Sequence, residues 1–184
     1  MTEPSIYSLL LTALLTAVAA AWDLRTGEIP NRLVAIGGAA CVSAAVAAGV
    51  LAGGWAILGT LLSMVLGAVL VSVVPLILFR AGGIGGGDVK LLAVVGLVLG
   101  PYLGLQAELY AFVVAMLYAP ARLIWDGRFI HAVKTIGVLT IRPFLPKHRR
   151  PDPVPLEELT ALRFGPAIFV GTLLTTVPHL AGLR

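Results

Sequence analysis

The fold follows from residues 55–91, which read WAILGTLLSMVLGAVLVSVVPLILFRAGGIGGGDVKL. The first 25 residues, from Trp55 to Phe79, contain no charged side chain. A helix of that length extends about 37 Å and exceeds the hydrocarbon core of a bilayer, which is roughly 30 Å thick. The segment therefore predicts a transmembrane helix. It is followed by a glycine-rich loop that ends on a carboxylate, Asp88.

The rest of the chain is similarly apolar. Of its 184 residues, 59% are hydrophobic and 12% are charged, and the mean hydropathy is +0.99. A water-soluble domain of this size cannot bury so much apolar surface. We therefore expect an all-α polytopic membrane protein with about six transmembrane helices, in the apolar stretches at residues 6–22, 33–51, 55–79, 89–105, 109–124 and 164–180.

The fourth and fifth stretches are each near the lower length limit for a transmembrane helix, and little divides them. Only Gly100-Pro101 and the residues from Gln106 to Glu108 interrupt the apolar run. A re-entrant segment is the competing interpretation. The first stretch lacks the basic residues that open a secretion signal, so we expect a retained helix there.

The basic residues orient the predicted helices. Segments before the first stretch, after the second and between the fourth and fifth contain no Lys or Arg. Cytoplasmic loops are enriched in these residues, so six spans with both termini outside place the basic loops in the cytoplasm, as for an inner-membrane protein. The net charge of +4 therefore reflects topology and gives no reason to expect nucleic-acid binding.

Two carboxylates lie at the ends of apolar stretches on this cytoplasmic side. Asp23 closes the first stretch and Asp88 precedes the fourth, so two helices separate them and return the chain to the same face. An ionisable residue beside a spanning segment is by default a candidate functional residue. The alternative is structural: Asp23 is then the first polar residue after a helix end, and Asp88 lies at a helix start, where the helix dipole favours an acid.

Two carboxyl groups in a partly desolvated pocket cannot both ionise easily. One then acts as general base on water while the protonated one polarises a carbonyl group, as in aspartic proteases. This chemistry needs no metal and no cofactor. The single cysteine, Cys41, and the three dispersed histidines also offer no metal-ligand spacing.

Two sequence motifs resemble those of the type IV prepilin peptidase family, which are GxGD-type intramembrane aspartic proteases. They are WD at residues 22–23 followed by IPN at 29–31, and GGGDVKL at 85–91. A weaker similarity is FGP at residues 164–166. The resemblance implies that Asp23 and Asp88 are the catalytic pair. It also marks further motif and substrate-loop positions, of which the proline and asparagine shape the site: Gly85, Gly86, Gly87, Lys90, Pro30 and Asn31.

The resemblance also implies a substrate, namely a prepilin with a basic leader and a hydrophobic helix. Bifunctional members carry a cysteine-containing cytoplasmic insertion linked to N-methylation, and the sequence has no such insertion. It is similar to the short peptidase-only form of Flp or tight-adherence pilus systems, so we expect cleavage without methylation. Archaeal preflagellin peptidases are close relatives that the sequence separates poorly. Recognition of the leader is expected to rest on Glu28, Asp126, Glu157 or Glu158, or on the backbone of the glycine loop.

We expect one transmembrane peptidase domain over residues 1–184, with residues 122–163 as a cytoplasmic loop. Part of this loop has partial helical spacing of apolar residues, which fits a helix along the inner leaflet; an ordinary basic loop is the favoured alternative. Membrane lipid is an expected partner, and a homo-oligomer is left open.

Two other classes of protein also fit parts of the sequence. A small proton- or cation-coupled transporter using Asp23 and Asp88 would explain the acids, but the two halves of the chain show no visible repeat. A non-catalytic assembly subunit would explain the many small residues suited to helix packing.

Overall fold

The computed structural model describes residues 4–125, 127 and 163–182. All regular structure in these residues is helical. The chain divides into two compact parts, one formed by residues 1–115 with 163–184 and the other by residues 116–162. The interfacial helix predicted after residue 128 lies outside the described residues, as do Asp126, Glu157 and Glu158.

Helix α1 runs from Ile6 to Thr26, one turn further than the apolar stretch predicted. Ser5 caps its start by accepting a hydrogen bond from the backbone of Ser8. Gly27 ends it in the left-handed region, at φ 76°, and donates its N–H to the carbonyl oxygen of Asp23. A glycine adopts this conformation without strain, so the helix stops one turn after Asp23.

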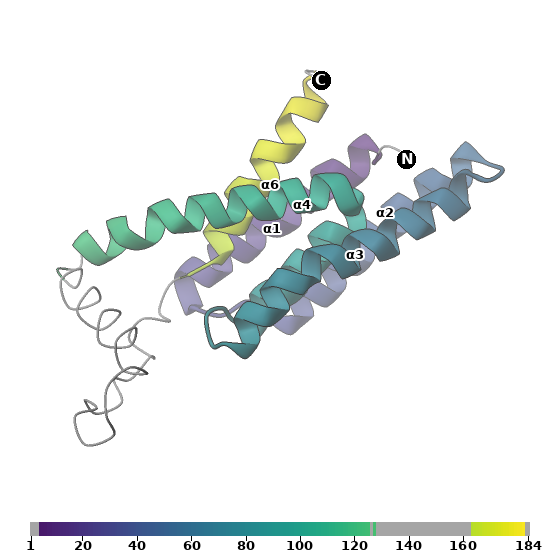
Figure 1. The fold of residues 1–184 in the computed structure, drawn as a ribbon. Coiled ribbons are helices and arrows are strands. Elements are labelled where there is room, and N and C mark those ends of the chain that lie inside the picture. Colours follow the sequence, from purple (N-terminus) through teal and green to yellow (C-terminus); the bar gives the residue numbers. More distant parts are fainter. Residues whose placement is uncertain (1–3, 126, 128–162, 183–184) are drawn as a thin grey trace. The chain divides into compact units, whose positions relative to one another are not determined.

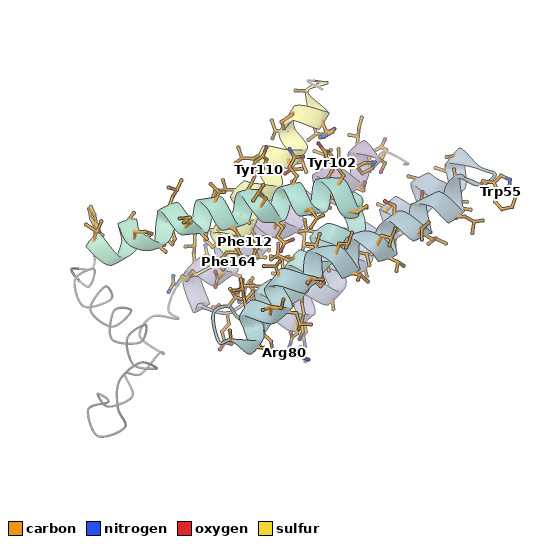
Figure 2. The ribbon with its side chains drawn as sticks, viewed as in Figure 1. Trp55, Arg80, Tyr102, Tyr110, Phe112 and Phe164 are labelled. Atoms are coloured by element: carbon orange, nitrogen blue, oxygen red, sulfur yellow. The ribbon has the colours of Figure 1, made fainter. Side chains whose placement is uncertain are left out.

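Helices α2 (Asn31–Ala52) and α3 (Ala56–Arg80) form an antiparallel hairpin that turns at Gly53 and Gly54, both with positive φ (Figure 1). Helix α2 also packs against α1, and α1 packs extensively against α6 (Gly165–Leu180). The side chains of Trp55 and Arg80 mark opposite ends of α3 (Figure 2).

Helix α4 (Gly86–Trp125) contains the break between the fourth and fifth predicted segments. Gly100 has φ 76° and ψ −178°, which is not helical, and Pro101 follows it with no N–H to continue the helix. The break is therefore at Gly100, and the prediction of a second interruption from Gln106 to Glu108 was wrong, because those residues lie inside the second arm.

The two arms of α4 fold back on each other at this break. A Cβ atom on Gly104 would lie 2.9 Å from the Cα of Gly96, although residues eight positions apart in a continuous helix are about 12 Å apart. A Cβ on Gly67 of α3 would lie 2.0 Å from the carbonyl oxygen of Gly96. Glycine at these three positions lets the backbones touch.

The arrangement agrees with a polytopic membrane protein. Four helices, namely α1, α2, α3 and α4, are long and apolar enough to cross a membrane, judged by length and composition, and α6 is a shorter apolar helix. Because α4 is divided at Gly100, the described residues contain six apolar helical segments. Helix α3 exposes large apolar side chains around much of its surface, which suits contact with lipid.

Candidate active site

A cavity of about 340 Å³ lies where the end of α1, the start of α2 and the start of α4 meet. Seven of the eight residues that the sequence marked for the site line it; the exception is Pro30, which precedes α2 as its N-cap. Glu28 also lines the cavity. The seven are Asp23, Asn31, Gly85, Gly86, Gly87, Asp88 and Lys90.

Asp23 lies in the last turn of α1 and is 4% exposed. Its Oδ2 accepts a hydrogen bond of 2.9 Å from the backbone N–H of Gly165, the first residue of α6. The first N–H groups of a helix have no partner within that helix, and the dipole there favours a negative charge. The carboxylate of α1 therefore caps the N-terminus of α6.

Asp88 is the third residue of α4 and is 9% exposed. Its Oδ2 accepts a hydrogen bond of 3.2 Å from the backbone N–H of Gly85, which caps the start of its own helix. Its Oδ1 is buried and has no hydrogen-bond partner among the described residues. An unpaired buried oxygen costs about 1–3 kcal/mol, so this atom stands ready for a ligand or water.

The two carboxyl groups share one cavity and interact electrostatically. Each has one oxygen bound to a backbone N–H and contributes to the same lining. The parity of the helices between Asp23 and Asp88 predicted that they would reach the same face, and the structure brings them to one site.

The glycine loop packs tightly against the turn between α1 and α2. A Cβ on Gly87 would lie 2.9 Å from the Cβ of Ile29 and 3.0 Å from its carbonyl oxygen. Lys90 Nζ donates a hydrogen bond of 2.7 Å to Oδ1 of Asn31, so a second contact joins the same two segments. Through these contacts Gly87, Lys90 and Asn31 join the start of α4, which carries Asp88, to the segment that follows Asp23.

The FGP segment packs against Asp23 at the start of α6. A Cβ on Gly165 would lie 2.8 Å from Oδ2 and 2.9 Å from the Cβ of Asp23, so only glycine fits. The ring of Phe164 packs against Phe112 of α4, with centroids 5.4 Å apart (Figure 2). The FGP segment thus joins α6 both to Asp23 and to α4.

Two polar residues with notable positions in the structure were not predicted from the sequence: one lies beside Asp23, and the other is a buried acid. Arg163, assigned only to the basic loop, donates a hydrogen bond to the carbonyl oxygen of Leu24, next to Asp23. Its position one residue before FGP was the available signal. Glu108, taken as a mark between helices, is 3% exposed within α4, and its Oε1 has no hydrogen-bond partner among the described residues.

The described residues thus form a helical membrane protein in which two buried aspartates line one cavity. The family model described as the type IV leader peptidase family matches residues 9–120, a range that contains both aspartates, and the chain belongs to this family. A search of curated proteins and a search of solved structures gave no match.

Proposed function

We propose that the protein is an intramembrane aspartic endopeptidase that removes the basic leader from type IV prepilins of the Flp-like kind. Membership of the leader peptidase family supports a peptidase acting on such substrates in general terms. The observation that carries the aspartic mechanism is the single cavity shared by Asp23 and Asp88, with one buried carboxyl oxygen left unpaired.

In this mechanism one aspartate is ionised and the other is protonated. The ionised carboxylate takes a proton from water, whose oxygen forms a bond to the scissile carbonyl carbon. The protonated carboxyl group donates a hydrogen bond to the carbonyl oxygen, which gains the negative charge. The carbon–nitrogen bond of the tetrahedral intermediate then breaks, and the leaving amine takes up a proton from a carboxyl group.

We place this site at the cytoplasmic face of the inner membrane, with both termini outside. The support is the positive-inside distribution, since Arg25, Arg32, Arg80 and Lys90 all lie at the same end of the bundle as the cavity. When the basic leader of a prepilin stays in the cytoplasm, the junction between the leader and the hydrophobic helix lies at the same face of the membrane as this site.

The glycine loop gives an extended peptide a place to bind. Gly85, Gly86 and Gly87 line the cavity beside Asp88 and present backbone without side chains. A peptide backbone can approach such a loop closely. The scissile bond, which lies after a small residue such as glycine in this family, would then sit between the loop and the aspartates.

Glu28 is the acid we assign to recognition of the basic leader. It lines the cavity, and within the described part of the chain its carboxylate has no ion-pair partner, whereas Lys90 is engaged with Asn31. A Glu28→Gln variant is expected to raise the KM for a basic leader roughly five-fold with little change in kcat, as for one exposed charge pair. Steady-state cleavage of a detergent-solubilised prepilin measures both constants.

A charge-reversal pair makes the Glu28 test specific. A Glu28→Lys variant should recover affinity when the leader residue nearest the cleavage site is changed from Lys to Glu. Equal effects of Glu28→Gln on basic and neutral leaders would remove Glu28 from leader recognition.

The proposed function is tested by expressing the protein with a Flp-type prepilin and measuring the mass of the product. Cleavage at the boundary between leader and hydrophobic segment is expected, with an unmodified new N-terminus. A product heavier by a methyl group, about 14 Da, when a methyl donor is supplied would contradict the peptidase-only form. Absence of cleavage of several Flp-type prepilins by protein present in the membrane would contradict the proposed substrate.

A further inference from the structure

Helices α1 and α6 cap each other at the site. Asp23, near the C-terminus of α1, accepts the N–H of Gly165 at the N-terminus of α6. In return, Arg163, two residues before Gly165, donates to the carbonyl oxygen of Leu24 in the last turn of α1. A carboxylate thus meets the positive end of one helix, and a guanidinium meets the negative end of the other.

These contacts make the surroundings of the two aspartates unequal. Asp23 faces a helix N-terminus from another segment and interacts electrostatically with Arg163. Among the residues that the structure describes, Asp88 has only the N–H of Gly85 from the start of its own helix, and its other oxygen is buried without a partner. A positive charge beside one member of a carboxyl pair decides which of the two carries the negative charge.

We propose that Arg163 is a positioning residue that, with the N–H of Gly165, keeps Asp23 as the ionised general base and leaves Asp88 as the protonated general acid. This assignment rests on the proposed peptidase function. From the sequence, Arg163 belongs only to the basic loop that orients the chain in the membrane, so this role is additional.

Within the described part of the chain, Arg163 is the cation that interacts electrostatically with Asp23. From the turn after α1, Glu28 lines the cavity and opposes ionisation, and from α4 the acid Asp88 does the same. Lys90, also from α4, lines the cavity and donates to the neutral side chain of Asn31, so it keeps its positive charge, which the two aspartates share. Arg25 is exposed and, two positions after Asp23, points about 200° away around α1.

The test is the pH dependence of kcat/KM for Arg163→Gln, Arg163→Lys and the matched control Arg25→Gln. The substrate is a prepilin peptide without Asp, Glu or His and with an amidated C-terminus, so that no carboxyl or imidazole group of the substrate titrates. The acid limb of this profile reports ionisation of the free enzyme's base. Loss of the Arg163 charge should move that limb to higher pH by roughly half a unit, a modest shift because the guanidinium is exposed.

The Arg163→Lys and Arg25→Gln variants should keep the wild-type acid limb. A uniform loss of rate at every pH in Arg163→Gln, or an unchanged profile, would overturn the proposal and leave Arg163 as a structural cap. If Arg163→Gln does not accumulate, the pH profile of the wild type is measured at low and high salt concentration instead. Salt screens an exposed guanidinium, so high salt should move the acid limb of kcat/KM to higher pH. An unmoved limb would overturn the proposal, whereas failure of the wild type to cleave would instead reject the peptidase function.

Discussion

Purified Asp23→Asn and Asp88→Asn variants are each expected to lose prepilin cleavage by at least roughly 1,000-fold. Each change is nearly isosteric and removes the ability of one carboxyl group to exchange a proton, and a positioned acid or base contributes about 10²- to 10⁴-fold to a rate. The two acids act as a unit, so the double variant should be no slower than either single variant. Product formation over time, measured by mass, gives the three rates.

Stability separates loss of chemistry from loss of fold in these variants. Asp88→Asn removes a buried ionisable group and keeps an oxygen that can accept the Gly85 N–H, so this variant is expected to unfold in detergent at a temperature no lower than the wild type. Substantial cleavage by either variant would remove that aspartate from the catalytic pair. A large fall in unfolding temperature with loss of activity would instead assign the residue a structural role.

A Gly165→Ala variant is expected to reduce kcat by roughly 100-fold or more while the protein still folds. Its Cβ would lie 2.8 Å from Oδ2 and 2.9 Å from the Cβ of Asp23, so the carboxylate must move. The displacement also breaks the hydrogen bond from the Gly165 N–H to Asp23. A shift of about 1 Å at a catalytic group costs about 10²-fold in rate. Single-turnover cleavage measures this step.

A glycine in the loop beside the site provides the matched control. A Cβ on Gly83 would meet only the carbonyl oxygen of Leu78, at 3.4 Å, and the Cβ of Leu78, at 4.0 Å, which are ordinary contacts. Gly83→Ala should therefore cleave at close to the wild-type rate. Comparable losses in Gly83→Ala and Gly165→Ala would show that added bulk near the site, and not contact with Asp23, causes the effect.

The helices and their order could be predicted because hydrocarbon thickness imposes a minimum length on apolar segments. Charge bias together with the number of spans between Asp23 and Asp88 predicted that both acids would reach one face. This inference needed no knowledge of helix packing. The catalytic role of these acids stays a prediction that the variants above test.

The packing within the bundle could not be predicted in the same way. Gly100-Pro101 and the segment at Gln106 offered similar local signals, and the break formed at the first. Glycines at positions 67, 96 and 104 determine how closely the arms approach, but only the three-dimensional contacts show that these glycines meet. Glu108 is a polar residue between two apolar runs and so resembled a loop residue, because its burial inside the bundle depends on contacts that the sequence does not show.

Contacts across long sequence separation were also hidden from the sequence. Arg163 and Leu24 are 139 positions apart, and Gly165 and Asp23 are 142 apart. Composition and periodicity describe neighbours along a helix, whereas these pairs depend on which helix ends meet in space. The FGP segment carried a weak family signal but no indication that its glycine N–H binds an aspartate.

The glycine packing of α4 also bears on how a substrate enters. Where Gly96 lies against Gly67 and Gly104, backbone meets backbone, and the buried side chain of Val71 packs against both Gly96 and Gly104. The scaffold under Asp88 is therefore stiff. For the proposed peptidase, we therefore expect room for a peptide to come from the glycine loop before α4 and from the turn at residues 27–30. The hydrogen bond between Lys90 and Asn31 joins the two helices, α4 and α2, that follow these segments.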